Sequence, residues 1–159
     1  MVCLAADKIQ EYTTHGALVR EISLEQAGVR FPWHAVQLST GDYVVSECRS
    51  KSPGAVSVVG IDGRVVRRYC PSPSSDIGEM NTPTGLAVTK NDDILVADAW
   101  NNRILLVNSS LRSARELALP VDDGIKTPWS LCLDESRGRL YVGECADYRL
   151  VSVLDGVRL

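Results

Sequence analysis

An internal repeat constrains this chain more than any other feature of its sequence. Three stretches share one plan: a proline, a short apolar segment, a turn at Gly, Asn or Asp, and a second apolar segment that ends in an acid. They are PWHAVQLSTGDYVVSEC (32–48), PTGLAVTKNDDILVADA (83–99) and PWSLCLDESRGRLYVGEC (128–145). Repetition of this kind indicates an architecture of similar units stacked on one another.

Each unit continues past its acid with further short segments. AVSVV and RVVRRY follow the first acid, and ILLV and ARELAL follow the second, with polar turns such as IDGR and NSSL between them. Short runs of β-branched and apolar residues bounded by turns favour antiparallel strands. No longer stretch has a helical periodicity, since SLEQAGVR (23–30), the best candidate, is too short.

Four strands in about 45 residues are typical of one blade of a β-propeller. We therefore predict an all-β fold of four-stranded propeller blades, with about 14 or 15 strands and almost no helix. The chain is expected to form a single propeller segment: a partial blade at 1–24, blades at 31–69 and 82–119, and a truncated blade at 127–159. An ordinary β-sandwich is the alternative, but a sandwich requires no sequence repetition.

The second complete unit resembles an NHL repeat. The matching residues are Pro83, Gly85, Asp98, Asn102, Arg103 and Ile104. The resemblance implies a β-propeller, usually of six blades, of which this chain would supply about 3.5 to 4. The ring would then be completed by further blades or by self-association. NHL propellers in the tripartite-motif ubiquitin ligases present surfaces to substrates or partners, and some bind single-stranded RNA.

Charge and composition narrow the classes of partner. The formal net charge is −3, which offers no basic footprint for RNA. No apolar run approaches the roughly 18 residues that span a membrane. The five cysteines are widely spaced and form no CxxC pair, so we expect reduced thiols and a cytoplasmic protein. The sequence suggests no cofactor.

The first strand of a blade starts at the same rim where the second strand ends, so the repeat brings two sets of loops together. The predicted partner-binding residues on this rim are Trp33, His34, Arg49, Lys51, Trp100, Asn101, Trp129 and Tyr148. Tryptophan beside basic and tyrosine side chains is typical of binding hot spots. The alternative is that the tryptophans pack between blades or within their loop.

The repeated acids allow two interpretations. An arginine five residues after the acid predicts a structural pair, Asp98 with Arg103 and Glu144 with Arg149. Carboxylates around a channel also suit a divalent cation. The gluconolactonases and peptide-amidating lyases, which resemble these repeats, hold a metal there. We favour the structural pairs and predict no metal site.

The predicted function is that of a non-enzymatic interaction module. His34 is the candidate closest to the channel, but the sequence places no serine or cysteine nucleophile with a supporting acid beside it. The expected partner is a protein, such as the substrate of a ubiquitin ligase whose catalytic domains lie elsewhere, and RNA is less well supported. The alternative is a metal-dependent hydrolase or lyase.

Overall fold

Strands dominate the protein, as the repeat predicts. The computed structural model describes residues 2–4, 7–48, 53–118, 124–145, 150–157 and 159, and in them it has 14 strands and two short 3-10 turns. The strands form four antiparallel sheets, and within each sheet they follow one another in chain order. The prediction of an all-β fold of propeller blades is confirmed.

The four sheets correspond to successive repeats. The first sheet contains β1 (Val2–Leu4), β2 (Lys8–Tyr12) and β3 (Leu18–Ser23). The second sheet contains β4 (Pro32–Gln37), β5 (Tyr43–Glu47), β6 (Ala55–Val59) and β7 (Val65–Tyr69). The third sheet contains β8 (Pro83–Val88), β9 (Ile94–Asp98), β10 (Arg103–Val107) and β11 (Ala114–Glu116), with the turn η1 (Ala99–Asn101) after β9. The fourth sheet contains β12 (Pro128–Asp134), β13 (Arg139–Glu144) and β14 (Leu150–Asp155), with the turn η2 (Glu135–Arg137) after β12.

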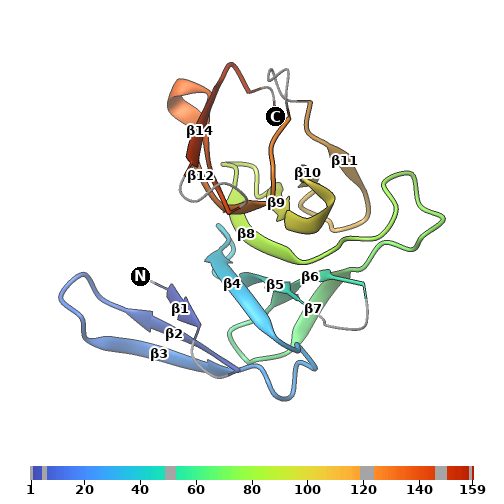
Figure 1. Ribbon diagram of the computed structural model, residues 1–159. Helices are drawn as coiled ribbons and strands as arrows, with labels where there is room; N and C mark the ends of the chain where they lie inside the picture. Colours follow the sequence, from blue (N-terminus) through green and yellow to red (C-terminus); the bar gives the residue numbers. More distant parts are fainter. Residues whose placement is uncertain (1, 5–6, 49–52, 119–123, 146–149, 158) are drawn as a thin grey trace.

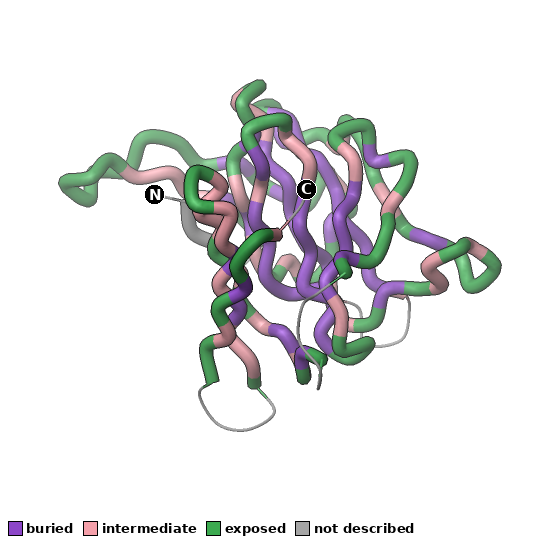
Figure 2. Tube along the Cα trace, turned by 90° about the horizontal axis from the view of Figure 1, so that it is seen from above, coloured by how far each residue is buried: buried purple, intermediate pink, exposed green. Residues whose placement is uncertain are grey.

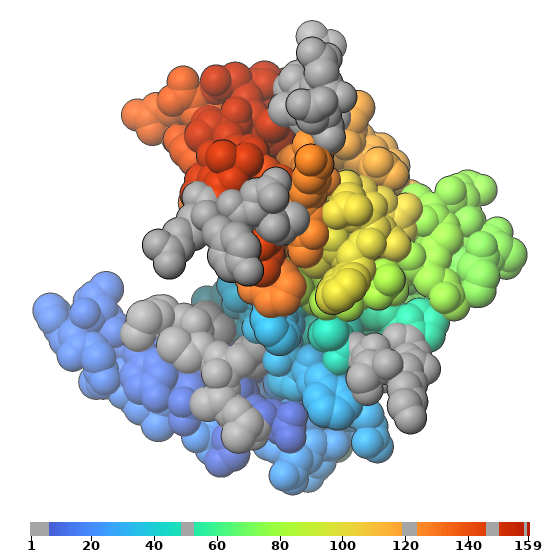
Figure 3. All heavy atoms as spheres, in the orientation of Figure 1, coloured from blue at the N-terminus to red at the C-terminus, as the bar shows by residue number. Residues whose placement is uncertain are grey.

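The sheets are arranged as an arc of blades around a common centre. Figure 1 shows the first sheet in blue and the fourth in red at the two ends of the arc. The first strands of neighbouring blades contact each other, β4 with β8 and β8 with β12, so they lie innermost. Figure 3 shows open space between the blue and the red ends in this view. The chain therefore forms part of a propeller ring.

A separate hydrophobic core fills each junction between neighbouring sheets. Ile9 and Ile22 of the first sheet pack with Val45 of the second. The second and third sheets share a cluster that includes Val56, Leu86 and Val96. The third and fourth share one that includes Ile104, Leu140 and Leu154. Figure 2 shows these buried stretches in purple through the middle of the arc.

Burial on both faces explains why the central strands read as continuous apolar runs. Successive side chains of a strand point to opposite faces. In β5, Val44 packs toward the third sheet and its neighbour Val45 toward the first. All five residues of β5 and all five of β9 are buried, including the acids that end them. The alternating pattern of a one-sided sheet is therefore absent from these strands.

Gly85 of the NHL-like unit is required by a close approach of two blades. A Cβ atom at this position would lie 2.8 Å from the Trp129 carbonyl oxygen and 2.8 Å from the Ser130 Cα atom. Both are atoms of the β12 backbone, which cannot move aside cheaply. The glycine therefore lets β8 and β12 pack closely at the centre of the arc.

Apolar side chains remain exposed at both ends of the arc. Leu18 and Val19 lie on β3 of the first sheet, and Leu150, Val151 and Val153 lie on β14 of the fourth. A complete propeller buries such side chains between blades. In the described residues, no helix has the length and apolar character to cross a membrane.

Candidate functional site

Each of the three repeats builds the same junction between its first and second strands. The proline pairs across the sheet with the acid: Pro32 with Glu47, Pro83 with Asp98, and Pro128 with Glu144. This register places the starts of β4, β8 and β12 and the ends of β5, β9 and β13 along one rim. The repeat therefore has the geometry that we expected from its sequence.

The acids hold a strained turn that precedes each proline. The preceding residues have positive φ angles of 52°, 60° and 47° at Phe31, Thr82 and Thr127. A side-chain-bearing residue in this region costs about 1–3 kcal/mol. One residue earlier, a backbone N–H donates to the carboxylate, from Arg30 to Glu47 (3.2 Å), Asn81 to Asp98 (2.6 Å) and Lys126 to Glu144 (2.7 Å). The nearly constant spacing of proline and acid thus has a structural cause.

Asp98 and Arg103 form the predicted pair. The Arg103 Nε–H donates to Asp98 Oδ2 at 2.8 Å, and the Asn101 amide donates to the same oxygen at 2.8 Å. Asp98 is fully buried, and the Arg103 side chain is 14% exposed. Arg103 also donates to the Glu79 carbonyl oxygen, so it ties the end of β9 to the loop that enters β8.

Glu47 pairs with an arginine of the fourth strand of its sheet, a partner that the sequence did not suggest. Ser57 of β6 donates to Glu47 Oε1 at 2.6 Å, and Arg68 of β7 forms an ion pair with Oε2. Arg68 lies directly opposite Ser57 in the sheet. The partner comes from the fourth strand because the position opposite Glu47 is occupied by Ala55.

Glu144 accepts a hydrogen bond from a serine, as Glu47 does, but its other neighbours differ. Ser152 of β14 donates to Glu144 Oε1 at 2.5 Å, as Ser57 does to Glu47. Leu150 lies directly opposite Glu144 in the sheet. The predicted partner, Arg149, lies outside the described residues, so the Glu144–Arg149 pair stays a prediction.

Two of the three tryptophans meet at the rim. Trp33 and Trp129 are the bulged, unpaired residues of β4 and β12, and a bulge redirects the side chain that it carries. Their ring centroids are 5.0 Å apart in an edge-to-face arrangement of 87°. Between them in the chain, Thr84 occupies the corresponding position of β8 and is buried, with its hydroxyl donating to the Pro128 carbonyl oxygen. The rings therefore meet beside the start of β8.

Trp33 is 46% exposed and Trp129 half-buried, so neither ring is enclosed between blades.

Trp100 extends the aromatic surface on the neighbouring blade. It lies in η1 and is 66% exposed, while its backbone N–H is held by the Asn81 carbonyl oxygen. The turn η1 contacts β12, the strand that carries Trp129. Asn102 fixes this contact, since its side-chain oxygen accepts a hydrogen bond from the Thr127 N–H at 2.8 Å. We name the surface formed by Trp33, Trp100 and Trp129 the tryptophan rim.

Two other predicted rim residues have structural contacts. His34 Nδ1 accepts a hydrogen bond from the Leu86 backbone N–H at 3.0 Å, and burial lowers the pKa of the imidazole. The amide of Asn101 donates to Asp98 and to the Glu79 carbonyl oxygen. Both side chains thus position the rim. Arg49, Lys51 and Tyr148 lie outside the described residues and remain predictions.

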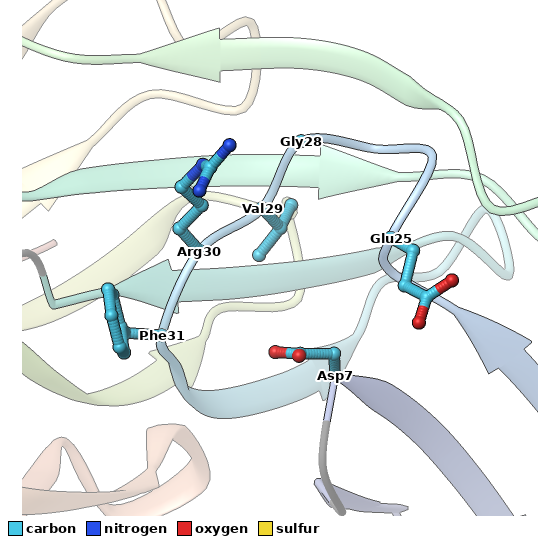
Figure 4. A pocket seen from close by; sticks show the side chains of 6 residues that line it. All are labelled: Asp7, Glu25, Gly28, Val29, Arg30 and Phe31. Carbon is cyan, nitrogen blue, oxygen red and sulfur yellow. The ribbon is translucent and has the colours of Figure 1, made fainter.

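Phe31 is an aromatic residue of the rim that the sequence argument missed. It precedes Pro32 and is 66% exposed. It also lines a surface pocket of about 360 Å³ together with Asp7, Glu25, Gly28, Val29 and Arg30. Figure 4 shows the Asp7 carboxylate turned toward the Phe31 ring. The sequence could have indicated Phe31, because it directly precedes the proline of a repeat, and the residue at that position lies in the turn at the rim in all three repeats.

Within the described residues, no three side chains of histidine, cysteine, aspartate or glutamate gather in a group suited to a metal ion. The three rim acids instead have the hydrogen bonds given above.

Comparison with known proteins identifies the repeat and the fold. Residues 80–105 match the family model of the NHL repeat. This segment contains the residues on which the resemblance was based, including Pro83, Gly85 and Asp98. The comparison with curated proteins finds no match.

Solved structures share the arrangement of blades at low sequence identity. The nidogen/laminin complex matches with a TM-score of 0.64 and 17% identity, over 94% of this chain and 51% of that chain. Hydrazine synthase of Kuenenia stuttgartiensis matches with a TM-score of 0.60 and 18% identity, over 94% and 46%. Virginiamycin B lyase from Staphylococcus aureus matches with a TM-score of 0.52 and 15% identity, over 92% and 48%.

The chain thus spans about half the length of these structures. Their functions differ, so the similarity identifies the fold alone.

Proposed function

We propose that this chain, an arc of β-propeller blades with an NHL repeat at residues 80–105, is a non-enzymatic module that binds a protein partner through the tryptophan rim. The observation that carries the proposal is the exposed edge-to-face pair of Trp33 and Trp129, with Trp100 66% exposed on the adjoining turn. All three tryptophans of the chain contribute to this surface.

The energetics of aromatic burial support this choice of surface. A tryptophan side chain buries a large apolar area when a partner covers it, and its indole N–H supplies a directional hydrogen bond. Tryptophan is enriched among the few interface residues whose truncation costs more than about 2 kcal/mol. The rim also rests on rigid strands and on hydrogen-bonded turns, so little conformational entropy is lost when a partner binds.

The contacts of the rim acids favour a structural role for them over a catalytic one. Glu47 accepts hydrogen bonds from Ser57 and Arg30 and pairs with Arg68, and Asp98 pairs with Arg103. A carboxylate that gave up these donors to bind a metal would release the strained turn before its proline. These contacts therefore favour a binding module.

The NHL resemblance suggests the kind of partner. We propose a protein that a ubiquitin ligase selects as its substrate, with the catalytic domains supplied elsewhere in the assembly. Cys48, Cys70, Cys132 and Cys145 are free thiols, which suits a cytoplasmic module. RNA remains the less favoured partner because the net charge of the chain is −3.

The competing function is that of a metal-dependent hydrolase or lyase, and the fold shared with virginiamycin B lyase is the observation that favours it. Titration calorimetry with Ca²⁺ and Zn²⁺ distinguishes the two functions. Stoichiometric binding that disappears in Glu47→Gln would support the enzyme. We expect no such binding.

A quantitative capture experiment tests the proposed surface. The immobilised chain and its Trp100→Ala variant are each incubated with cell extract, and bound proteins are quantified by mass spectrometry. Ile61→Ala is the matched control, because Ile61 is 61% exposed and lies in a turn of the second sheet.

We expect a protein that both the wild type and Ile61→Ala retain and that Trp100→Ala loses. The purified partner should then bind Trp100→Ala at least about tenfold more weakly than wild type. Equal retention by all three proteins would reject the tryptophan rim as the contact surface.

A further inference from the structure

A surface pocket recurs at the same place in two of the blades. Beside the first sheet, a pocket of about 360 Å³ is lined by Asp7, Glu25, Gly28, Val29, Arg30 and Phe31, and we name it the Phe31 pocket. Beside the third sheet, a pocket of about 410 Å³ is lined by Asn102, Arg103, Glu116 and the loop that follows β11. None of these lining residues belongs to β8, the first strand of the third sheet. The outer strands and the loop that leads to the next blade therefore form this kind of pocket.

Matching residues show that the two pockets are one repeated feature. Asp7 and Asn102 directly precede β2 and β10, and both have positive φ angles, 62° and 53°. Gly28 and Gly124 each lie four residues before the proline of the next blade, with φ angles of 62° and 68°. The Phe31 pocket is therefore a regular part of the repeat that carries its own set of side chains.

The pocket of the third sheet already contains a guanidinium. Arg103 lines it and lies between two acids, with Nε 2.8 Å from Asp98 and a terminal nitrogen 3.9 Å from Glu116. Lys8 takes the same position at the start of β2, but its ammonium group donates to Glu21 at 2.7 Å and does not line the Phe31 pocket. The repeat thus places a guanidinium at this position in the third sheet, whereas in the first sheet the chain provides no arginine there.

Acidic and aromatic side chains face the Phe31 pocket. Asp7 carries a carboxylate where the third sheet has the neutral amide of Asn102, and Glu25 adds a second carboxylate. Phe31 is 66% exposed, and Figure 4 shows the Asp7 carboxylate turned toward its ring. The Phe31 backbone is held in place, since its carbonyl oxygen accepts a hydrogen bond from the Cys48 N–H at 3.1 Å. A guanidinium can stack on such a ring and donate hydrogen bonds to such a carboxylate.

Two cations of the chain lie near the pocket without filling it. Figure 4 shows the Arg30 guanidinium directed away from Asp7. The hydrogen bond from Lys8 to Glu21, and to a smaller extent the charge of Glu25, raise the pKa of the Lys8 ammonium group. An anionic ligand would be repelled by Asp7 and Glu25, and an apolar ligand would remove water from them without replacing its hydrogen bonds. The pocket therefore favours a cation.

We propose that the Phe31 pocket binds an arginine side chain of a partner protein. The guanidinium stacks on the Phe31 ring and donates hydrogen bonds to the Asp7 carboxylate, and Glu25 adds electrostatic attraction. A volume of about 360 Å³ is within the range of pockets that bind small ligands. Arginine is preferred to lysine because its guanidinium is planar and less strongly hydrated than an ammonium group.

An arginine carried by a protein fits this pocket better than the free amino acid does. The α-carboxylate of free arginine would be repelled by Asp7 and Glu25, whereas a peptide backbone carries no such charge. Phe31 is two residues from Trp33 in the sequence, so a protein that covers the tryptophan rim can also reach the pocket. Arginine binding here can be tested without that protein and does not depend on the function proposed for the tryptophan rim.

The chain has a single phenylalanine, so a label on its ring reports on this pocket alone. Protein labelled with 4-fluorophenylalanine is titrated with the capped tripeptide acetyl-Gly-Arg-Gly-amide and followed by fluorine NMR. We expect one resonance that shifts saturably at millimolar peptide. The lysine tripeptide should bind at least about threefold more weakly. The tripeptide with citrulline, which has the shape of arginine without its charge, should bind at least about tenfold more weakly.

Three protein variants locate the site. Asp7→Asn introduces the residue of the third sheet, which tolerates a positive φ angle, and should weaken binding of the arginine tripeptide by about tenfold. Asp76→Asn is the matched control, because it removes the same charge from an exposed position in the loop between the second and third sheets, and it should change affinity by less than about twofold. Saturation-transfer NMR observes the peptide itself, so it extends the test to Phe31→Leu, for which we expect a loss of about two- to fivefold. Thermal melting confirms that the variants fold.

Several results would overturn the proposal. These are the absence of a saturable shift in the folded wild type, equal affinities for the arginine and citrulline tripeptides, and equal affinities of Asp7→Asn and Asp76→Asn for the arginine tripeptide. Free arginine that binds about tenfold more tightly than the tripeptide would instead assign the pocket to an amino-acid ligand and would also overturn the proposal.

Discussion

Removal of Arg103 tests whether the rim acids are structural. In Arg103→Ala the Asp98 carboxylate stays fully buried and keeps only the hydrogen bonds from the Asn81 N–H (2.6 Å) and the Asn101 amide (2.8 Å). Breaking a buried ion pair by removal of one partner costs about 3–5 kcal/mol. The two remaining donors reduce this cost, so we expect a loss of about 2–3 kcal/mol in the free energy of unfolding. For a domain of this size that lowers the Tm by about 5–10 °C.

Urea denaturation followed by circular dichroism measures this effect, with Arg139→Ala as the matched control. Arg139 also pairs with an aspartate, Asp155, at 2.5 Å, but the two side chains are 42% and 67% exposed. An exposed pair contributes less than about 1 kcal/mol. Equal destabilisation by the two variants would refute the argument that burial makes the Asp98–Arg103 pair important.

Three further predictions follow from contacts elsewhere in the arc. Gly85→Ala should lower the free energy of unfolding by about 2 kcal/mol or more, since the added Cβ would lie 2.8 Å from the β12 backbone. A Tm within about 2 °C of the wild-type value would contradict this prediction. Trp100→Ala should change stability by less than about 0.5 kcal/mol, because the ring is 66% exposed, and a collapsed fold would identify it as a packing residue. Burial lowers the pKa of His34 in the folded state, so the unfolded state binds more protons and stability should fall as the pH decreases below about 6.5. The difference between the free energies of unfolding at pH 7.5 and 5.5 should be smaller in His34→Asn than in the wild type. An equal difference in the two proteins would exclude His34 as the cause.

Much of the fold was predictable because the repeat itself indicates how the first two strands of each blade pair. The proline and the acid of each unit pair across the sheet, so the distance between them in the sequence already defines one hairpin. The apolar runs indicated short strands, and the structure shows that β5 and β9 are buried on both faces. The Asp98–Arg103 pair was predictable because Arg103 follows Asp98 by five positions, across a short turn that places the two residues directly opposite each other.

Other contacts join residues that are far apart in the sequence, so no local sequence pattern predicts them. Arg68 reaches Glu47 from the fourth strand of its sheet, whereas Asp98 pairs with Arg103 at the start of the third strand. No constant spacing in the sequence therefore predicts the Glu47–Arg68 pair. His34 accepts a hydrogen bond from Leu86, 52 residues away on another sheet. The meeting of Trp33 with Trp129 requires the curvature of the arc, since an entire blade lies between them in the chain. Sequence periodicity describes each blade well, but the angle between blades depends on side-chain packing.

Fluorine NMR of the 5-fluorotryptophan-labelled chain tests the proposed binding surface most directly. The chain has three tryptophans, Trp33, Trp100 and Trp129, so three resonances report the whole tryptophan rim and nothing else. When the partner found by capture is added, we predict that at least two of the three resonances shift or broaden in proportion to the fraction bound. Saturated binding that leaves all three resonances unchanged would contradict the assignment of the rim as the partner surface.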